Sequence, residues 1–154
     1  MLRGIKRIKT PPEQWKAKED SLYRNLWATI LPFGIRQAKS QNDQMLKFTR
    51  NLVKTGIYDK DCKFFPYWEQ NSVKAENMLV KNNKKPQSAV IIVSNYFSKS
   101  PRQVKLDVNF KALGFSEKSR IIDLETKKKI DLNNITINGY DFKLIQIIDR
   151  RKEK

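Results

Sequence analysis

The chain has 154 residues, of which 39% are hydrophobic and 31% charged, and its net charge is +16. It contains no histidine and one cysteine, Cys62. These counts exclude Ser-His-Asp and Cys-His catalytic arrangements, histidine-ligated metal sites, an intrachain disulfide and a cysteine-ligated zinc site. No stretch approaches the roughly 18 apolar residues of a membrane span, and the basic N-terminus lacks the apolar segment of a signal peptide. We therefore expect a soluble chain without a cofactor, and the sequence leaves its localisation open.

The positive charge is spread along the whole chain. Residues 1–62 carry 13 basic and 6 acidic side chains, and residues 63–154 carry 19 and 10. A dedicated nucleic-acid surface more often concentrates lysines and arginines in one patch, with aromatic residues among them. Two interpretations remain open: a generally lysine-rich composition, and a specific site for a polyanion.

Residues 1–62 are predicted to form a helical segment with two helices. The first helix begins at Thr10-Pro11-Pro12-Glu13, where threonine suits the N-cap, proline is tolerated in the first turn and the glutamate has the capping-box position. Its apolar positions are Trp15, Leu22, Leu26 and Ile30, with Tyr23 and Trp27 alongside. Pro32 ends this helix, and residues 31–34 read as a turn.

The second helix is predicted to begin near Ser40 and to stop at Gly56. Its apolar face consists of Met45, Phe48, Leu52 and Val53. Both helices need a partner surface for their apolar faces, and the candidate surface in this chain is the β-domain that follows. Residues 63–72, which contain Phe64, Phe65, Tyr67 and Trp68, are interpreted as an aromatic linker.

From residue 73 onward the apolar period changes to two, which is typical of strands. We expect a hairpin of Val73–Lys81 and Ser88–Phe97 around the turn-prone residues 82–86, with the apolar run Ala89–Val93 as a central strand. The alternation from Val104 to Phe110 predicts a half-buried strand. The remaining predicted elements are a helical turn closed by Gly114, a hairpin of Arg120–Glu125 with Lys129–Leu132, and strands Ile135–Asn138 and Phe142–Ile148 joined by an Asn138-Gly139 turn.

Together these elements predict an α+β chain, in which an N-terminal helical segment of two helices precedes a small antiparallel β-sandwich. The expected units are the helical segment 1–62, the aromatic linker 63–72 and the sandwich 73–150.

Several short motifs occur in the order found in one enzyme family. Ser88–Asn95, the strand Val104–Val108, Leu113-Gly114, the hairpin Asp123-Leu124-Glu125-Thr126 and the strand Asp141–Ile145 resemble the C-terminal sandwich of bacterial glycoside hydrolases. Residues 31–34 and 65–69 resemble the last β/α unit of the catalytic (β/α)8 barrel of that family and the connection out of it. The resemblance covers about Ser21 to Ile148.

The resemblance implies a C-terminal part of such an enzyme, and a full-length member would be exported. Two features depart from the family pattern. Lys127 stands where the hairpin usually has glycine, so a turn that favours positive φ there has to accommodate a Cβ. The paired carboxylates of glycoside hydrolysis would lie on earlier barrel strands, so the resemblance assigns no catalytic residue in this chain.

Tyr67, Trp68 and Glu69 are the candidate carbohydrate contacts, because flat apolar rings match the C–H face of a pyranose. The alternative for the rings is packing between the sandwich and the helical unit, and the alternative for Glu69 is a solvated or arginine-paired linker residue. Lys127, Lys128 and Lys129 are the candidate polyanion contacts at a hairpin tip, with a solvated loop as the alternative.

The leading functional hypothesis is a non-catalytic C-terminal part of a glycoside-hydrolase-like protein that braces a catalytic barrel and contacts carbohydrate. The isolated chain is then expected to have no hydrolase activity, and to self-associate if its helices do not fold back on the sandwich. The alternative is a small basic module that binds nucleic acid or another polyanion. A third hypothesis is a sandwich that binds carbohydrate without hydrolysing it.

Overall fold

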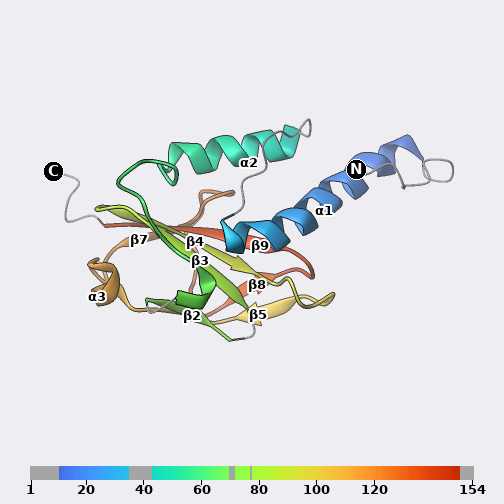
Figure 1. Cartoon of the computed structure of the whole chain (residues 1–154). Coiled ribbons are helices and arrows are strands. Elements are labelled where there is room, and N and C mark those ends of the chain that lie inside the picture. Colours follow the sequence, from blue (N-terminus) through green and yellow to red (C-terminus); the bar gives the residue numbers. More distant parts are fainter. Residues whose placement is uncertain (1–10, 35–42, 70–71, 77, 150–154) are drawn as a thin grey trace.

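The computed structural model describes residues 11–34, 43–69, 72–76 and 78–149, arranged in three layers (Figure 1). Helices form the first layer, a five-stranded antiparallel sheet the second, and short two-stranded ladders with one short helix the third. The helices of the first layer are α1 (Pro12–Ile30) and α2 (Asp43–Lys54), with a 3-10 turn, η2 (Leu31–Phe33), directly after α1. The predicted α+β class with an antiparallel sandwich is confirmed.

The central sheet has the strand order β1-β3-β4-β9-β7. Its strands are β1 (Lys63–Phe65), β3 (Leu79–Lys84), β4 (Ser88–Ser94), β7 (Arg120–Asp123) and β9 (Phe142–Ile148). Strand β4 lies in the middle and pairs with β9 along its whole length, from Ser88 opposite Ile148 to Ser94 opposite Phe142. The prediction of a central strand at residues 89–93 is therefore confirmed, and its apolar residues are buried because both faces of the sheet are covered.

The third layer consists of two short ladders and a helix. Strand β2 (Val73–Ala75) pairs with β6 (Leu106–Val108), and β5 (Arg102–Val104) pairs with β8 (Ile135–Ile137). The short helix α3 (Phe110–Leu113) ends at Gly114, which has φ 69° as predicted for a left-handed stop. One core lies between this layer and the sheet; its largest fully buried members are Ile91, Leu113, Ile135, Ile137, Ile145 and Ile147.

The second core joins the helices to the other face of the sheet. Trp27, Ala28 and Leu31 from the first helix and turn, and Met45, Phe48 and Leu52 from α2, pack against Val90, Ile92, Phe142 and Leu144. The edge-to-face contacts of Phe48 with Trp27 and with Phe142, at centroid distances of 4.8 and 5.2 Å, link both helices and the sheet. The β-domain is thus the partner surface of the helices, as expected.

The inward faces of the helices differ from the prediction by one position. Trp27 and Ala28 face the sheet, whereas Leu22 and Leu26 stay exposed. On α2, Val53 is 54% exposed, although it was placed on the buried face with Leu52. Adjacent helical residues point about 100° apart, so a buried stripe centred on Trp27 and Ala28 leaves Leu26 at its border, and the burial of Leu52 turns Val53 toward solvent. The N-cap of α1 is Pro11, without a side-chain cap, rather than the predicted Thr10, which lies outside the described residues.

Several predicted strands are shorter or divided. The segment predicted as one strand over residues 73–81 is divided into β2 and β3, which belong to different ladders, and β3 extends through the predicted turn to Lys84. Buried Asn82 there donates a hydrogen bond from Nδ2 to Ser72 Oγ at 3.0 Å, which gives its amide a partner inside the fold. The strand predicted around 104–110 is divided at Lys105 for the same reason, since β5 and β6 pair with different partners.

The hairpin after β7 and the turn at residues 139–140 are both formed, but their geometry differs from the prediction. Opposite β7, a single bridge from Ile122 to Lys129 replaces the predicted strand at 129–132. Residues 139–140 form a turn, and Tyr140, not Gly139, has the positive φ, at 51°. Gly139 is required for another reason: a Cβ there would overlap the backbone carbonyl of Lys99. None of the helices in the described part of the chain has the length and apolar character of a membrane span.

Candidate functional site

Four aromatic side chains from three segments lie together at the β1 edge of the central sheet. We call Phe33, Phe64, Tyr67 and Trp68 the aromatic platform. Phe33 belongs to η2, Phe64 to β1, and Tyr67 and Trp68 to the 3-10 turn η3 (Tyr67–Glu69). Residues 63–69, predicted as a linker, thus include a strand of the sheet, because β1 pairs with β3 from Lys63 opposite Lys84 to Phe65 opposite Asn82.

Tyr67 lies at the centre of the aromatic platform. Its ring meets Phe33 edge to face at a centroid distance of 5.3 Å and Trp68 at 5.0 Å. The ring of Phe64 covers Gly34, where a Cβ would come within 3.1 Å of Phe64 Cζ. These edge-to-face contacts hold neighbouring rings in defined orientations.

The aromatic platform is exposed even though the Tyr67 ring touches those of Phe33 and Trp68. All four side chains are among the exposed large hydrophobic residues, and Trp68 is 58% exposed. None of the four rings belongs to either buried core. Packing between the sandwich and the helical unit, the predicted alternative, therefore does not cover the solvent-facing side of each ring. Contiguous exposed apolar surface of this kind is typical of binding sites. Glu69 is exposed beside the rings, with its backbone N–H donating to the Pro66 carbonyl at 3.1 Å.

A second exposed aromatic pair lies after β4. Tyr96 and Phe97 meet at a centroid distance of 5.1 Å, and Phe97 is 67% exposed. This pair consists of two rings from one loop, whereas the platform brings together rings from three segments. It therefore offers a natural control for experiments on the platform.

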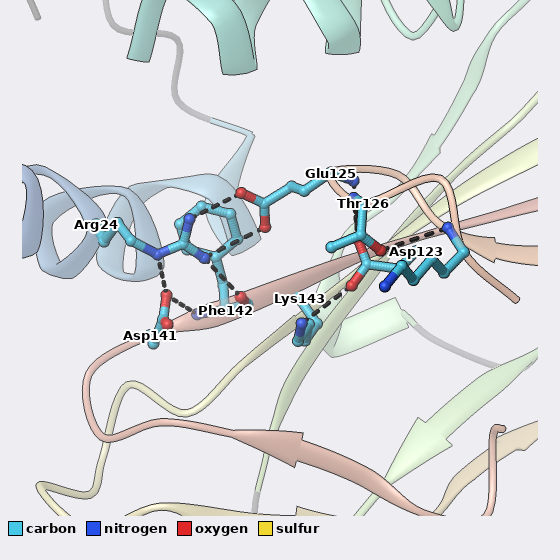
Figure 2. A network of polar contacts seen from close by, with 8 residues as sticks. Arg24, Asp123, Glu125, Thr126, Asp141, Phe142 and Lys143 are labelled. Carbon is cyan, nitrogen blue, oxygen red and sulfur yellow. Dashed lines mark hydrogen bonds and ion pairs between the residues drawn. The ribbon is translucent and has the colours of Figure 1, made fainter. Parts of the chain in front are cut away.

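A polar network fastens α1 to the sheet (Figure 2). Arg24 donates from Nε to Asp141 Oδ1 at 2.7 Å, from Nη1 to Glu125 Oε1 at 2.8 Å and from Nη2 to the Phe142 carbonyl at 3.2 Å. Its guanidinium also lies 4.6 Å from the centroid of the Phe142 ring. Burial by itself lowers the pKa of Arg24, but the hydrogen bonds and charges of Glu125 and Asp141 outweigh it and raise that pKa.

Asp123 organises the hairpin beside this network. Its Oδ1 accepts hydrogen bonds from the backbone N–H groups of Glu125 and Thr126, at 2.8 and 3.0 Å, and its Oδ2 accepts one from Lys143 Nζ at 3.0 Å. Burial would raise the pKa of this carboxyl, but the Thr126 N–H and the Lys143 ammonium outweigh burial and lower the pKa below its ordinary value. Glu125, Asp141 and Asp123 are thus engaged with cations and backbone donors, an arrangement that anchors structure.

The remaining candidate groups form a small cluster near Cys62. Burial raises the pKa of this thiol, although Asn83 and Lys85 act in the opposite direction. A raised pKa reduces the thiolate fraction and disfavours nucleophilic chemistry. Lys85 pairs with Asp59 at 2.5 Å and Asp61 at 3.4 Å, so the two aspartates share a cation. Within the described residues, no group of three or more acidic or cysteine side chains is placed to hold a metal ion.

The lysine run at 127–129 is divided by the hairpin geometry. Lys127 and Lys129 line a surface cavity together with Lys118 and Arg120, whereas Lys128 is not among the lining residues. Lys127 has φ 61°, as expected for a turn position that favours glycine.

Sequence reasoning identified Tyr67, Trp68 and Glu69 but did not add Phe33 to them, and it assigned no role to Lys118, Arg120 or Arg24. The sequence feature that could have identified Phe33 is its position directly before Gly34 in a predicted turn, because residues in turns are often exposed. For Arg24 no local signal exists, because its carboxylate partners lie 101 and 117 residues away.

Comparison with known proteins yields two weak structural matches. No protein-family model and no curated protein matches the chain. Among solved structures, a catalytic mutant of a GH42 beta-galactosidase from G. stearothermophilus aligns with 66% of the chain at a TM-score of 0.35 and 17% identity. A second structure of that enzyme aligns with 65% at a TM-score of 0.35 and 18% identity. The chain spans 12% of the length of each. Similarity at this level establishes neither a shared fold nor a shared activity.

Proposed function

We propose that this chain is a non-catalytic module of a glycoside-hydrolase-like protein and contacts carbohydrate through the aromatic platform. The observation that carries the proposal is the group of exposed rings at the β1 edge of the sheet. Tyr67 contacts Phe33 and Trp68, and Phe64, from a third segment, covers Gly34 next to Phe33. Sugar rings stack on such faces because their C–H groups are apolar. Glu69, exposed at the end of η3, supplies a carboxylate that accepts hydrogen bonds from sugar hydroxyls.

The sequence resemblance supports the same class of protein. Its motifs occur in family order along residues 21–148, and the sandwich that they predict is formed. The two carboxylates of the polar network at α1, Glu125 and Asp141, are bound to Arg24. They therefore stabilise the helix–sheet contact and are not disposed as the acid and nucleophile that glycoside hydrolysis requires.

The bracing part of the proposal concerns the outer face of α1. Leu22 and Leu26, one turn apart, are exposed there, while the opposite face packs on the sheet. We place the catalytic barrel on this outer face. In the isolated chain the same leucines promote self-association, and replacing both with glutamine should reduce it, which sedimentation velocity over a range of protein concentrations measures.

The carbohydrate contact is tested with Trp68→Ala and Tyr67→Ala, assayed by affinity electrophoresis and calorimetry on a panel of soluble polysaccharides and oligosaccharides. The proposal expects glycan binding by the unaltered chain and at least a tenfold loss in both variants. The melting temperature of Trp68→Ala should stay within about 2 °C of the parent, because an exposed residue outside the cores contributes little stability.

The matched control is Phe97→Ala, which removes a ring that is at least as exposed from the other aromatic pair. It should leave glycan binding unchanged. Absence of binding to every glycan of the panel, or equal loss in Phe97→Ala and Trp68→Ala, would contradict the carbohydrate role. A large fall in melting temperature in Trp68→Ala with intact binding would show that the ring has a packing role instead.

A further inference from the structure

A cavity of about 480 Å³ lies beside β7, at the edge of the central sheet opposite the aromatic platform. Its lining comes from residues 117–122 and from the far side of the following hairpin, Lys127, Lys129 and Ile130. This volume falls within the range of small-molecule sites, about 300–1,000 Å³. The cavity is independent of the proposed carbohydrate contact, because the two share no residue and lie at opposite sheet edges.

The lining of the cavity is strongly basic. Lys118, Arg120, Lys127 and Lys129 contribute four positive charges and Glu117 one negative charge, which leaves a net charge of +3. None of these four cations forms an ion pair with a carboxylate in the part of the chain that the structure describes. Their mutual repulsion is therefore relieved by solvent, or by a bound anion.

The nearest buried acid is already neutralised. Asp123 follows the lining residue Ile122, but its carboxylate accepts hydrogen bonds from Lys143 and from the backbone of the hairpin. Lys143 is not among the lining residues. The carboxylate therefore does not offset the positive charge of the cavity, and it holds the hairpin that positions Lys127 and Lys129.

The backbone at Lys127 adds an independent observation. Its φ of 61° lies in the left-handed region, which disfavours a side chain with a Cβ. The conformation is held by two hydrogen bonds, from the Lys127 N–H to the Asp123 carbonyl and from the Asp123 N–H to the Lys128 carbonyl, both 2.8 Å. The hairpin turn therefore fixes the backbone at this position, as a turn also does at Tyr140, where φ is 51°. Here the strained position carries a lysine that lines the cavity.

Part of the lining of the cavity is apolar. Ile121, Ile122 and Ile130 line it, with Ile122 buried and the other two half-buried. A ligand that satisfies both parts has a multiply charged anionic group for the cations and an apolar portion for the isoleucines. Phosphate suits a site lined by four cationic residues, because its oxygens accept from several donors at once and Arg120 can donate to two of them.

We propose that this cavity binds a small organic phosphate, with the phosphate between Lys118, Arg120, Lys127 and Lys129 and the apolar part on the isoleucines. The test is a titration of the full ¹⁵N-labelled chain with phenyl phosphate, inorganic phosphate and benzoate at fixed ionic strength, followed by amide chemical shifts. Phenyl phosphate should saturate one site and shift the amides of residues 117–122 and 127–130. It should bind at least fivefold more tightly than inorganic phosphate, which lacks the apolar part, and than benzoate, which has a single charge.

Three single substitutions in one hairpin locate the site. Lys127→Gly removes one lining cation and suits the positive φ, and Lys129→Gln removes a second; each should weaken phenyl phosphate binding at least fivefold. Lys128→Gln removes the same charge from the same run but outside the lining, and should change the affinity less than twofold. Circular dichroism confirms that each variant folds.

Equal weakening by all three substitutions would overturn the proposal, because it would show diffuse electrostatic attraction to the lysine run. Shifts spread over the whole basic surface without saturation would overturn it as well. Equal affinity for benzoate and phenyl phosphate would show that the cavity does not select phosphate.

Discussion

Replacing Arg24 with alanine should lower the free energy of unfolding by about 2–3 kcal/mol, a value between those of exposed and fully buried ion pairs. Arg24 is the connection between α1 and the end of the sheet, through two carboxylates, a backbone carbonyl and an aromatic ring. Its removal leaves Glu125 and Asp141 close together without their cation. The variant therefore loses hydrogen bonds and also gains repulsion between two carboxylates.

The magnitude follows from the degree of burial. Breaking a fully buried ion pair costs about 3–5 kcal/mol, and an exposed pair contributes about 0–1 kcal/mol. The side chains of Arg24, Glu125 and Asp141 are 25%, 27% and 17% exposed, so solvent screens the network in part. We assign about 2 kcal/mol to the polar contacts, and the lost contact with the Phe142 ring adds about 0.5–1 kcal/mol.

Urea unfolding followed by circular dichroism measures the change, with Arg50→Ala as the matched control. Arg50 lies on the exposed side of α2, and its replacement removes the same charge and side chain from a helix. Arg50→Ala should change the unfolding free energy by less than about 0.5 kcal/mol. A double-mutant cycle of Arg24→Ala with Glu125→Gln should show a coupling of about 1 kcal/mol or more. The reasoning is refuted if the unfolding free energies of Arg24→Ala and Arg50→Ala lie within about 0.5 kcal/mol of each other. Independent substitutions add only to within about this value.

Three further predictions concern the same end of the molecule. Asp123→Asn should destabilise the fold by about 1 kcal/mol at pH 6. Folding lowers the pKa of Asp123 from 3.8, so its contribution is complete above the unfolded pKa and is lost progressively as pH falls from there through the lower folded pKa. The difference in urea midpoint should therefore begin to shrink between pH 6 and pH 3, and a constant difference would contradict this. Gly139→Ala should cost about 1–3 kcal/mol by overlap with the Lys99 carbonyl, and an unchanged melting temperature would show that this contact is not tight. Lys127→Gly should stabilise the chain by about 0.5–1 kcal/mol while weakening phosphate binding, and a lower urea midpoint would contradict the strained turn.

Much of the local structure could be predicted from residue patterns. The run Ala89–Val93 is apolar at every position, which in a strand requires cover on both faces, and the structure provides helices on one face and short ladders on the other. The stops at Gly56 and Gly114 have positive φ, as their positions after helical segments indicated. The positive φ at Lys127 could also be predicted, because a tight hairpin turn allows few backbone conformations.

The inward face of each helix was less predictable. The sequence pattern favoured Leu22 and Leu26 and placed Trp27 only alongside them, because the repeat of apolar residues defines the buried face of a helix only to within the angle between neighbouring residues. Packing on the sheet decides which residue faces inward. The large ring of Trp27, against Phe48, fills that space, and the leucines are left outside.

The sequence by itself determined the two helices, the central strand, the excess of positive charge and the exclusion of histidine chemistry, because each depends on composition or on contacts within a few residues. The limits of the shorter strands depended on which partner each one pairs with. The tertiary structure alone decided that Phe33 joins Tyr67 and Trp68, that Arg24 holds residues more than a hundred positions away, and that Lys127 and Lys129, but not Lys128, share a cavity with Lys118 and Arg120. The physical reason is that these groupings depend on the order and register of the strands. Sheet pairing brings distant segments together, and a shift of one residue sends a side chain to the opposite face.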